Sequence, residues 1–344
     1  MPQAQAVRNT TFYTDNDKRQ RVGGTIREYM GFFDETNGGG VEARKAQYAK
    51  MINNYYDVVT DFYEHGWGQS FHFAARSKME SFDASLARAE HYLALRLGLQ
   101  AGMRVLDVGC GVGGPMRSIA RFSDATVEGV NNNDYQLEKV RSHNEEAGLG
   151  HLCSAFKGDF MNLQVSDAFY DAAYQIEATC HAPNKTGAFS EIHRVLKPGA
   201  LFAGYEWCMT DAFDPADPRH QWIKNEIETG DSLPDIASIP ETIRALEAAG
   251  FEVLDSFDAV QRSDNETPWY LPLRGETSTL LGIRRGRLGR RIARRTIGAL
   301  EALGIAPKGS KEVSQMLGRA AEGLIAGGET GIFTPSFFFL ARRK

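Results

Sequence analysis

The sequence predicts an α/β protein with a doubly wound, mostly parallel sheet, and three observations support this fold class. Short apolar runs alternate with helix-length amphipathic segments from about residue 105 to residue 257. A glycine-rich turn, residues 109–114, directly follows the first apolar run. Each later run is separated from the next by enough chain for a crossover helix. This alternation favours parallel strands joined by helices that cover both faces of the sheet.

Two helices are expected before the sheet. The first 40 residues are polar, end in NGGG, and are expected to form a loosely ordered arm. The pattern from Val41 to Thr60 indicates a helix. Apolar residues then recur every three or four positions, which predicts a second amphipathic helix that ends near Gly98. These residues are Phe82, Leu86, Ala89, Leu93 and Leu97.

The elements of the sheet follow from the apolar runs and the turns beside them. Pro115 suits a first helical position, so a helix is expected directly after the glycine-rich turn. The aromatic run IFTPSFFFLARRK predicts a last strand at the C-terminus. The other expected strands cover 105–108, 125–130, 170–177, 201–207 and 251–257, and the expected helices cover 116–121, 135–147, 187–196 and 239–249.

Composition excludes several classes of protein. The net charge of -5 gives no reason to expect nucleic acid as the main partner. No apolar run approaches the roughly 18 residues that a membrane-spanning helix needs, and the first residues lack the apolar centre of a secretory signal. The four cysteines show no CxxC spacing, which fits an intracellular, reducing compartment. Neither HExxH nor a Cys/His cluster spaced for a metal occurs, so no metal is expected.

The turn VLDVGCGVGGP predicts a binding site for a cofactor. Glycine lets the backbone approach a ligand closely, and the helix that follows offers free N–H groups. A glycine turn alone is also typical of dinucleotide folds. The acid before the glycines completes the pattern (D/E)xGxGxG, which resembles the first motif of class I S-adenosylmethionine-dependent methyltransferases. The residues expected at the cofactor here are Asp107, Gly109, Cys110, Gly111 and Gly113.

The next two strand ends extend this cofactor site. The stretch VNNNDYQ places Asn131 where such enzymes carry a ribose-binding acid, and Asn132 and Gln136 follow it. An amide can also hydrogen-bond two hydroxyls. Asp159 and Phe160, in KGDF, match the usual adenine contacts at the end of the third strand. The alternative is that the acids of these motifs are only turn or cap residues.

The stretch YEHGWGQSFHF, residues 63–73, combines four aromatic rings, two histidines and two glycines beside a tryptophan. Neither helical nor strand periodicity explains that spacing, and the glycines weaken either element. We therefore expect a loop. Either its rings close the hydrophobic core over the sheet, or they line a binding site.

Four long motifs together resemble the sterol C-24 methyltransferases: YEHGWGQSFHFA, LDVGCGVGGP, YQIEATCHAP and YEWCMTDAFDP. The resemblance runs from about Asn53 to the C-terminus and includes PWYLPL and IFTPSFFFLAR. It implies a Rossmann-like class I methyltransferase core with an N-terminal helical cap and a C-terminal α+β extension. The expected divisions are a loosely ordered arm, an aromatic substrate lid, the cofactor-binding core and a substrate-side and membrane-side extension, at residues 1–40, 41–100, 101–260 and 261–344.

The resemblance also implies the reaction. Family members transfer a methyl group from S-adenosyl-L-methionine to C-24 of a Δ24-sterol side chain during sterol biosynthesis, leaving S-adenosyl-L-homocysteine. A carbon–carbon double bond needs no base to attack the methyl group. The resulting carbocation undergoes a hydride shift and then loses a proton. An aromatic face stabilises a nearby cation by roughly 0.5–2 kcal/mol without trapping it. We therefore expect Tyr63, Trp67, Phe71, Phe73 and Tyr205 at the substrate.

The candidates that accept a proton or orient the substrate are Glu64, His72, Glu177 and His181. A neutral, desolvated His72 could accept a proton, although a satisfied core histidine is the alternative. Glu177 ends a strand at the edge where open α/β sheets bind ligands, so it could contact cofactor or substrate. Tyr56 resembles a tyrosine that related lipid methyltransferases place over the cofactor.

Two other functions remain alternatives. One is methylation of another apolar lipid, as in cyclopropane-fatty-acid-type or tocopherol-type enzymes, and the other is a non-catalytic sterol carrier. The family often forms homo-oligomers. We expect an intracellular protein that is soluble or peripherally bound to a membrane (the endoplasmic reticulum face in a eukaryote). Membrane contact is expected because sterols reside in bilayers. The arginine-rich run 284–295 could dock on that membrane, or it could be a solvated helix.

Overall fold

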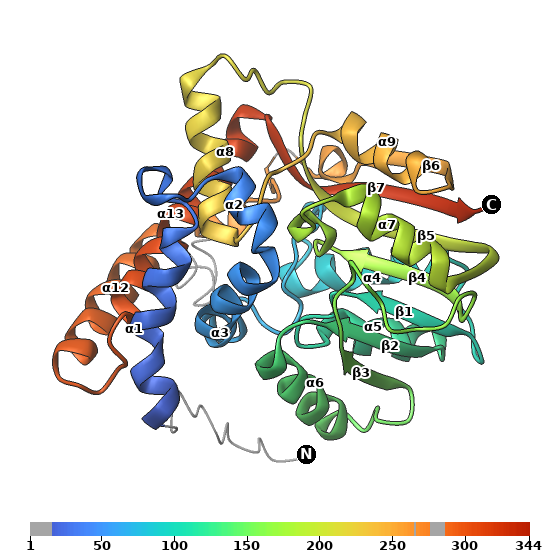
Figure 1. Cartoon of the computed structure of the whole chain (residues 1–344), viewed down its shortest axis with the longest axis horizontal. Helices are drawn as coiled ribbons and strands as arrows, with labels where there is room; N and C mark the ends of the chain where they lie inside the picture. The colour runs from blue at the N-terminus through green and yellow to red at the C-terminus, as the bar shows by residue number, and fades with distance from the viewer. Residues whose placement is uncertain (1–15, 265, 276–285) are drawn as a thin grey trace.

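A computed structural model of the protein describes residues 16–264, 266–275 and 286–344. Its centre is a seven-stranded sheet with the strand order β3-β2-β1-β4-β5-β7-β6 (Figure 1). Strand β7 runs antiparallel to both of its neighbours, and the other pairs are parallel. The strands are β1 (Arg104–Val108), β2 (Thr126–Asn131), β3 (Cys153–Lys157), β4 (Tyr170–Ile176), β5 (Leu196–Met209), β6 (Phe251–Asp258) and β7 (Phe333–Arg343). The prediction of a doubly wound, mostly parallel sheet is confirmed.

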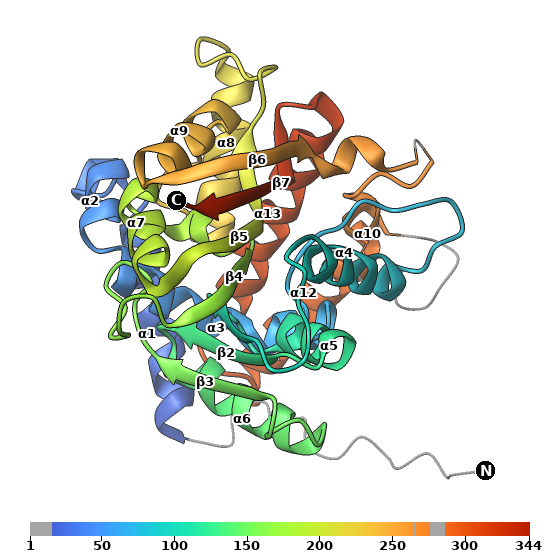
Figure 2. The same ribbon diagram turned by 90° about the vertical axis from the view of Figure 1, so that its right-hand side faces the viewer.

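Helices cover both faces of this sheet. Figure 2 shows α7 (Lys185–Val195) and α9 (Ile239–Ala248) on one side, and α4 (Phe82–Arg96) and α5 (Gly114–Ser123) on the other. Helix α6 (Asp134–Glu146) packs on β3 at the sheet's edge. Each helix packs an apolar stripe against the sheet, so the central strands are buried on both faces.

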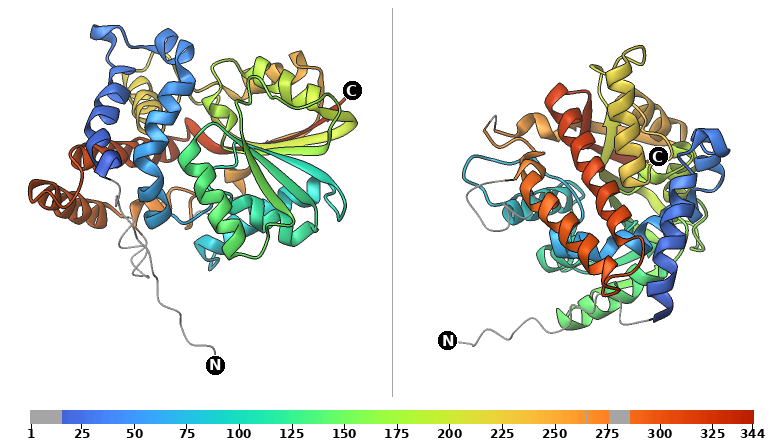
Figure 3. Two further views of the ribbon diagram at one scale, coloured as in Figure 1. Left: turned by 60° about the horizontal axis from the view of Figure 1, so that its bottom comes forward. Right: turned by 90° about the vertical axis from the view of Figure 1, so that its left-hand side faces the viewer.

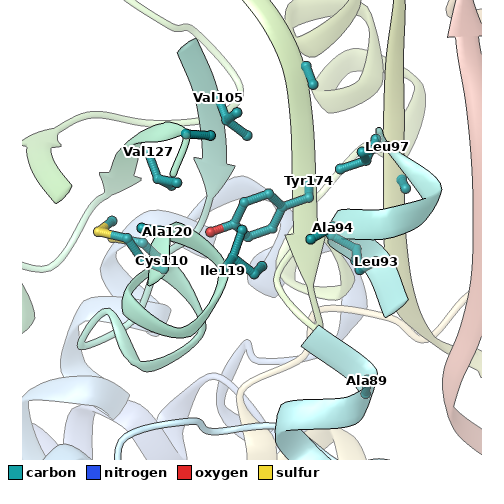
Figure 4. Close-up of a cluster of buried hydrophobic side chains, with 14 of the residues drawn as sticks. Ala89, Leu93, Ala94, Leu97, Val105, Cys110, Ile119, Ala120, Val127 and Tyr174 are labelled. Atoms are coloured by element: carbon teal, nitrogen blue, oxygen red, sulfur yellow. The ribbon is translucent and has the colours of Figure 1, made fainter. Parts of the chain in front are cut away.

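The core beneath the glycine-rich turn is organised around a tyrosine. Tyr174 projects from β4, and its fully buried ring lies between β1, β2, α4 and α5, beside Val105, Leu93 and Ile119 (Figure 4). Its hydroxyl donates a hydrogen bond to Asp107 Oδ2 at 2.9 Å. A ring at this place fixes the end of β1, where the glycine-rich turn begins.

A second group of helices caps one end of the sheet (Figure 3). Apolar residues of α1, α3 and α13 form its core, and α8 crosses α13 closely. The short helical segments are η1 (Glu35–Asn37), η2 (Thr179–His181), η3 (Ala259–Arg262) and α10 (Leu271–Arg274). The cap helices are α1 (Asn16–Gly31), α2 (Val41–Ala46), α3 (Tyr48–Gly66), α8 (Pro218–Asp231), α12 (Arg287–Ala302) and α13 (Ser310–Thr330).

Two local expectations were wrong. Residues 16–40 are not a loose arm, because Val22, Ile26 and Tyr29 of α1 are buried against the cap; residues 1–15 lie outside the described residues. The loop expected over residues 63–73 starts only after Gly66. The Trp67 N–H bonds to the Tyr63 carbonyl at 2.7 Å, which continues α3 through the first glycine.

Candidate active site

A cavity that is open to solvent lies where β1, β2 and β4 end. This edge of an open parallel sheet is where α/β proteins bind ligands. The wall combines the glycine-rich turn, the ends of β2 and β4, one face of α3 and the segment after α3. The main lining residues are Tyr48, Ile52, Tyr56, Gln69, Phe71, His72, Gly109, Cys110, Gly111, Asn131, Asn132, Gln136, Asp159, Phe160, Glu177 and His181.

The glycine-rich turn leaves no room for side chains at two of its positions. Gly109 has a φ of +77°, and an added Cβ would lie 2.5 Å from the Cβ of Ala178. At Gly114 an added Cβ would lie 2.1 Å from the carbonyl oxygen of Gln69. The chain after α3 therefore lies directly across the start of α5. The aromatic stretch is a lid over the turn, and its glycine-containing segment lets the two backbones approach.

Asp107 supports the turn from below and does not line the cavity. Its carboxyl group is buried and accepts the Tyr174 hydrogen bond. Burial raises the pKa of Asp107 to about 7, although the Tyr174 hydrogen bond opposes the shift. Gly113, at the N-cap of α5, also lies outside the cavity wall. Direct contact of either residue with a cofactor stays a prediction.

The amide of Asn131 is used within the protein. Its Nδ2 donates to the Gly111 carbonyl at 3.0 Å and to Gln136 Oε1 at 2.9 Å, and its Oδ1 accepts from the Asn133 N–H at 2.9 Å. Asn132 lines the same cavity, and its side chain has no hydrogen-bond partner among the described residues. Of the two asparagines, Asn132 is therefore the better placed to bind a ligand hydroxyl.

Helix α3 contributes a face of the cavity, of which the sequence indicated only Tyr56. Tyr48, Ile52 and Tyr56 lie four residues apart, so they project from one side of the helix. The Tyr48 hydroxyl donates a short hydrogen bond to Asp159 Oδ2. Asp159 Oδ1 accepts the Met161 N–H at 2.8 Å. Tyr48 thus occupies one oxygen of the carboxylate that is expected to meet the adenine amine.

Glu177 places a carboxyl group on the cavity wall at the end of β4. Its backbone is in the left-handed region with a φ of +54°, which costs a non-glycine residue roughly 1–2 kcal/mol and is typical of functional sites. Its Oε1 accepts the Phe73 N–H at 2.7 Å. Burial raises the pKa of Glu177 to about 8, and the nearby His72 partly offsets this shift.

The raised pKa of Glu177 should make the stability of the protein depend on pH. A carboxyl whose folded pKa lies above its unfolded value stabilises the fold while protonated. This contribution is complete below about pH 4.5 and is lost as the pH rises to about 8. Glu177→Gln removes the dependence, so the melting temperature of the variant relative to the parent should rise across that window. Scanning fluorimetry at several pH values measures it, and a constant or falling difference would contradict the assigned shift.

His181 also lines the cavity, with a neutral ring. Its Nδ1 lies 2.9 Å from the Ser232 carbonyl, which only accepts, so Nδ1 carries the hydrogen. Its Nε2 then accepts from the Tyr56 hydroxyl at 3.0 Å. Burial lowers the pKa of His181 to about 4. Tyr56 and His181 therefore form a hydrogen-bonded pair on the wall of the cavity.

His72 has the opposite protonation. Its Nδ1 lies 2.9 Å from the Phe73 carbonyl, and its Nε2 lies 3.1 Å from Glu90 Oε1. Burial favours the neutral ring, but the hydrogen bond and charge of Glu90 outweigh it and raise the pKa of His72. With both nitrogens donating, the ring has no free lone pair. This geometry departs from the expected proton acceptor and fits a buried ion pair that anchors the lid.

Glu64 lies away from the cavity, at the contact of α3 with α6. Its carboxylate pairs with His143 at 2.6 Å and with Lys139 at 2.5 Å. Burial opposes ionisation, but these partners lower the pKa of Glu64 overall. Among the described residues Glu64 is not part of the cavity wall, because α3 turns this side chain toward α6.

The aromatic residues expected at the substrate divide into three groups. Phe71 lines the cavity, and the Tyr63 ring packs edge-on against it at 5.4 Å. Trp67 and Phe73 belong to an apolar cluster that also holds Trp207, Trp269 and Phe333, which adjoins the cavity because Phe73 bonds to Glu177. Tyr205 lies elsewhere. Its ring is buried against Phe338 and its hydroxyl bonds to the Ala89 carbonyl, so it is a core residue under α4 rather than a substrate contact.

Comparison with known proteins identifies the family. The family models described as "Methyltransferase domain" and "Sterol methyltransferase C-terminal" match residues 106–204 and 280–343. The chain is 52% identical to cycloartenol-C-24-methyltransferase of Arabidopsis thaliana over 89% of this chain and 91% of that protein. It is 47% identical to sterol 24-C-methyltransferase ERG6 of Saccharomyces cerevisiae over 92% of this chain and 85% of that protein. The chain belongs to the sterol C-24 methyltransferase family.

Solved structures agree on the fold of this sterol C-24 methyltransferase family member. A mycolic acid cyclopropane synthase, CmaA1, solved with S-adenosylhomocysteine, aligns with a TM-score of 0.65 at 18% identity, covering 85% of this chain and 96% of that one. A geranyl diphosphate methyltransferase solved with sinefungin aligns with a TM-score of 0.63 at 15% identity, over 86% of this chain and 99% of that one. At these identities the likeness shows the α/β methyltransferase fold alone.

The cavity fits S-adenosyl-L-methionine, the cofactor of this methyltransferase family. A Cβ at Gly109 would collide with the protein, and Gly111 has a left-handed φ of +54°, so the turn exposes bare backbone to a ligand. A free amide at Asn132 and a carboxylate at Asp159 can hold hydroxyl and amine groups. Within the described ranges, no group of three or more His, Cys, Asp or Glu is placed to hold a metal ion.

The structure also shows a polar cluster in this methyltransferase that the sequence motifs did not indicate. Asp231, the last residue of α8, is buried beside the hydroxyls of Tyr55 and Tyr63. Burial raises the pKa of Asp231 to about 7. The sequence around Asp231 shows only an acidic residue at the end of a helix, which does not mark a functional site. The contact of α8 with α3 in the folded protein brings Asp231 to the site.

Proposed function

We propose that the protein transfers the methyl group of S-adenosyl-L-methionine to C-24 of a sterol with a Δ24 side-chain double bond. The observation that carries the proposal is the position of the cofactor cavity, which shares a wall with the aromatic cluster through Phe71, Phe73 and Glu177. Such a wall suits a neutral alkene that becomes a cation. The identity of 52% to a cycloartenol-C-24-methyltransferase supports the same substrate class.

The residues of the site divide the work of this reaction. The bound cofactor supplies an electrophilic methyl group on a positively charged sulfur. The glycine-rich turn, Asn132 and Asp159 would hold the cofactor, and the apolar lid would exclude water that could capture a cation. Aromatic faces stabilise positive charge by roughly 0.5–2 kcal/mol each. Glu177 and the Tyr56–His181 pair supply the polar groups beside the reacting carbon.

Competition between lipid classes tests the proposal. The purified protein is incubated with cofactor labelled in the methyl group and with vesicles that contain both a Δ24-sterol and unsaturated phospholipids. Label is expected in the sterol fraction only. Label in the fatty acids would identify another lipid methyltransferase, and sterol binding without any transfer would identify a carrier.

A sterol must be collected from a bilayer, and α12 is the surface we propose for that contact. In the left view of Figure 3 it lies at the edge of the molecule farthest from the sheet, packed on α13. Arg291, Arg294 and Arg295 are exposed along it. Ile292 is 55% exposed, and Leu303 just beyond the helix is 72% exposed. Cations beside exposed apolar side chains are typical of a surface that binds an anionic membrane.

The predicted docking segment also includes residues that precede α12. Leu280, Leu281 and Ile283 lie outside the described residues, as do the first two arginines of the run. No helix of the described residues has both the length and the apolar character needed to cross a bilayer. An intracellular location at a membrane face and assembly of identical chains stay predictions, which fractionation and light scattering would test.

Vesicle binding should depend on these arginines. Each contributes about 1 kcal/mol near an anionic leaflet, so replacing Arg291, Arg294 and Arg295 by glutamine should weaken binding to phosphatidylserine vesicles roughly 100-fold. Flotation on a density gradient measures it. The matched control replaces Arg121, Arg141 and Arg219, which are exposed on the sheet domain and on α8 and change the net charge equally. Equal losses in both triple variants would mean that only net charge matters.

A further inference from the structure

Two tyrosines and one carboxyl group form a hydrogen-bonded chain beside the cavity, in which Tyr55 and Asp231 are buried and Tyr63 is partly exposed. Tyr55 and Tyr63 come from α3, and Asp231 ends α8. The Tyr63 hydroxyl lies 3.3 Å from Asp231 Oδ1 and makes a short contact with the Tyr55 hydroxyl. The Tyr55 hydroxyl lies 2.8 Å from the Gly230 carbonyl oxygen. We call these groups the tyrosine–aspartate cluster.

The cluster lacks one proton when Asp231 is ionised. It has three contacts between oxygens, but the two hydroxyls supply only two hydrogens, and a carboxylate or carbonyl supplies none. With Asp231 protonated, each contact has one hydrogen: Asp231 donates to Tyr63, Tyr63 to Tyr55, and Tyr55 to Gly230. The second carboxylate oxygen, Oδ2, is buried without a hydrogen-bond partner in the described part of the chain. An ionised carboxylate is costly in such a place, so the ionised cluster holds any proton that reaches it.

The cluster lies one side chain away from the cavity. The Tyr63 ring packs edge-on against Phe71, and the Tyr55 ring packs edge-on against Tyr56 at 5.2 Å. Phe71 and Tyr56 both line the cavity. The charge of Asp231 is near enough to raise the pKa of Tyr56 and of Glu177, although burial is the larger cause for both. A carboxylate that is separated from the cavity by one side chain attracts a cation in the cavity but does not touch it.

We propose that Asp231, acting through the Tyr63 hydroxyl, is the final acceptor of the proton released by the methylated sterol cation. The inference rests on the proposed function and deepens it. A C–H bond beside the cationic carbon breaks, and its electron pair forms the new double bond. With the side chain of the sterol beside Phe71, the proton bonds to the oxygen of the partly exposed Tyr63, while the hydroxyl hydrogen of Tyr63 passes to Oδ1 of the ionised Asp231. The positive charge of the cation and the negative charge of the carboxylate cancel, and no other reactant is needed.

Two variants that keep the shape of the cluster test this relay. Asp231→Asn retains an oxygen toward Tyr63 but cannot take up a proton, and Tyr63→Phe keeps the ring but removes the relay. Each should lower the rate of product formation about 100-fold. Each should also shift the products from alkenes to alcohols, because a cation that cannot lose its proton survives until water captures it. Cofactor affinity should change less than threefold, because neither residue lines the cofactor cavity.

Further variants separate a relay from a structural role. The double variant should be no slower than the slower single variant, since both changes break one path. Asp231→Glu should restore part of the alkene product. Tyr29→Phe is the matched control for Tyr63→Phe: it removes another buried hydroxyl of the cap, which bonds to the Thr229 carbonyl outside the relay. It should leave the product ratio unchanged.

Several results would overturn the relay. Asp231→Asn with the parent's rate and product ratio would do so, as would Tyr29→Phe with the product shift expected of Tyr63→Phe. If Asp231→Asn fails to fold, Tyr63→Phe decides the question by the same product ratio. A parent protein that methylates no sterol would refute the proposed function and the relay together. Normal turnover by the parent with unchanged products in the variants would refute the relay alone.

Discussion

Gly109→Ala is expected to lower the affinity for S-adenosyl-L-methionine at least 100-fold. The residue has a φ of +77°, and the new Cβ would lie 2.5 Å from the Cβ of Ala178. The left-handed backbone costs a non-glycine residue about 1–2 kcal/mol, and relieving the overlap costs about 1–3 kcal/mol more. The turn must shift to relieve both, which moves the backbone that is expected to contact the cofactor. Since about 1.4 kcal/mol corresponds to tenfold in affinity, calorimetry should detect the loss easily.

Gly148→Ala is the matched control. Gly148 has a φ of +68°, close to that of Gly109, but an added Cβ there has no atom within 4 Å. The Gly148→Ala variant has a similar backbone strain, but it has no collision and lies away from the cavity. Its cofactor affinity should stay within threefold of that of the parent. If Gly109→Ala also bound the cofactor with the parent's affinity, the glycine-rich turn could not be the binding site.

Glu177→Gln is expected to reduce turnover at least 100-fold. Its carboxyl lies on the cavity wall between the turn and the aromatic cluster, where a positively charged cofactor and the developing cation would favour its ionised form. Electrostatic groups held in place before the reaction lower its barrier, and removing one typically costs 100- to 1,000-fold. Glutamine keeps an oxygen for the Phe73 N–H, so the lid should remain in place. Steady-state kinetics should therefore show a lower kcat with a smaller change in the KM for the cofactor.

Glu64→Gln removes the same charge at a matched position outside the cavity. Its partners Lys139 and His143 are only partly buried, and such pairs contribute about 0–1 kcal/mol to stability. Turnover should stay within threefold of the parent. A loss in Glu64→Gln as large as that in Glu177→Gln would show that net charge, rather than the position of the carboxyl, determines the rate.

The sheet was predictable because its signals are local. The apolar runs, the turn at Gly109 and the proline at Pro115 each follow from a few neighbouring residues. Helix α1 carried a signal as well, in the spacing of Val22, Ile26 and Tyr29, but its polar and glycine-rich surroundings hid it. Its order comes from burial against α3 and against α13, and α13 lies far away in the chain.

The candidate site was predictable where motifs mark it. Gly111, Asn132, Asp159 and Glu177 were expected at the cofactor or the reacting groups, and the structure brings them to one cavity. Their individual roles stay predictions. The direction of a side chain was not predictable. Glu64 directly follows Tyr63 of the aromatic stretch, yet it faces α6. One position along a helix rotates a side chain by about 100°, so neighbours in sequence point to different sides.

Residues that reach the site through tertiary contacts could not be found from motifs. Tyr56 was expected at the cofactor, and Tyr48 and Ile52 precede it at a spacing of four residues, so the helical pattern of α3 could have placed all three on one face. That pattern does not say which face meets the cavity. Asp231 has no such pattern, and only the packing of α8 on the cap places its carboxyl beside Tyr63.

Analysis of an isotopically labelled product tests methyl transfer to the sterol side chain most directly. The protein is incubated with cofactor that carries a trideuterated methyl group and with a Δ24-sterol that carries deuterium at C-24, and the product is examined by mass spectrometry and NMR. We predict that the labelled carbon is attached to C-24, with three deuterium atoms, or with two if this carbon loses the proton, and that the original deuterium lies on C-25, as a cation with a hydride shift requires. A sterol recovered without the label, or labelled on oxygen or on the ring system, would contradict this reaction.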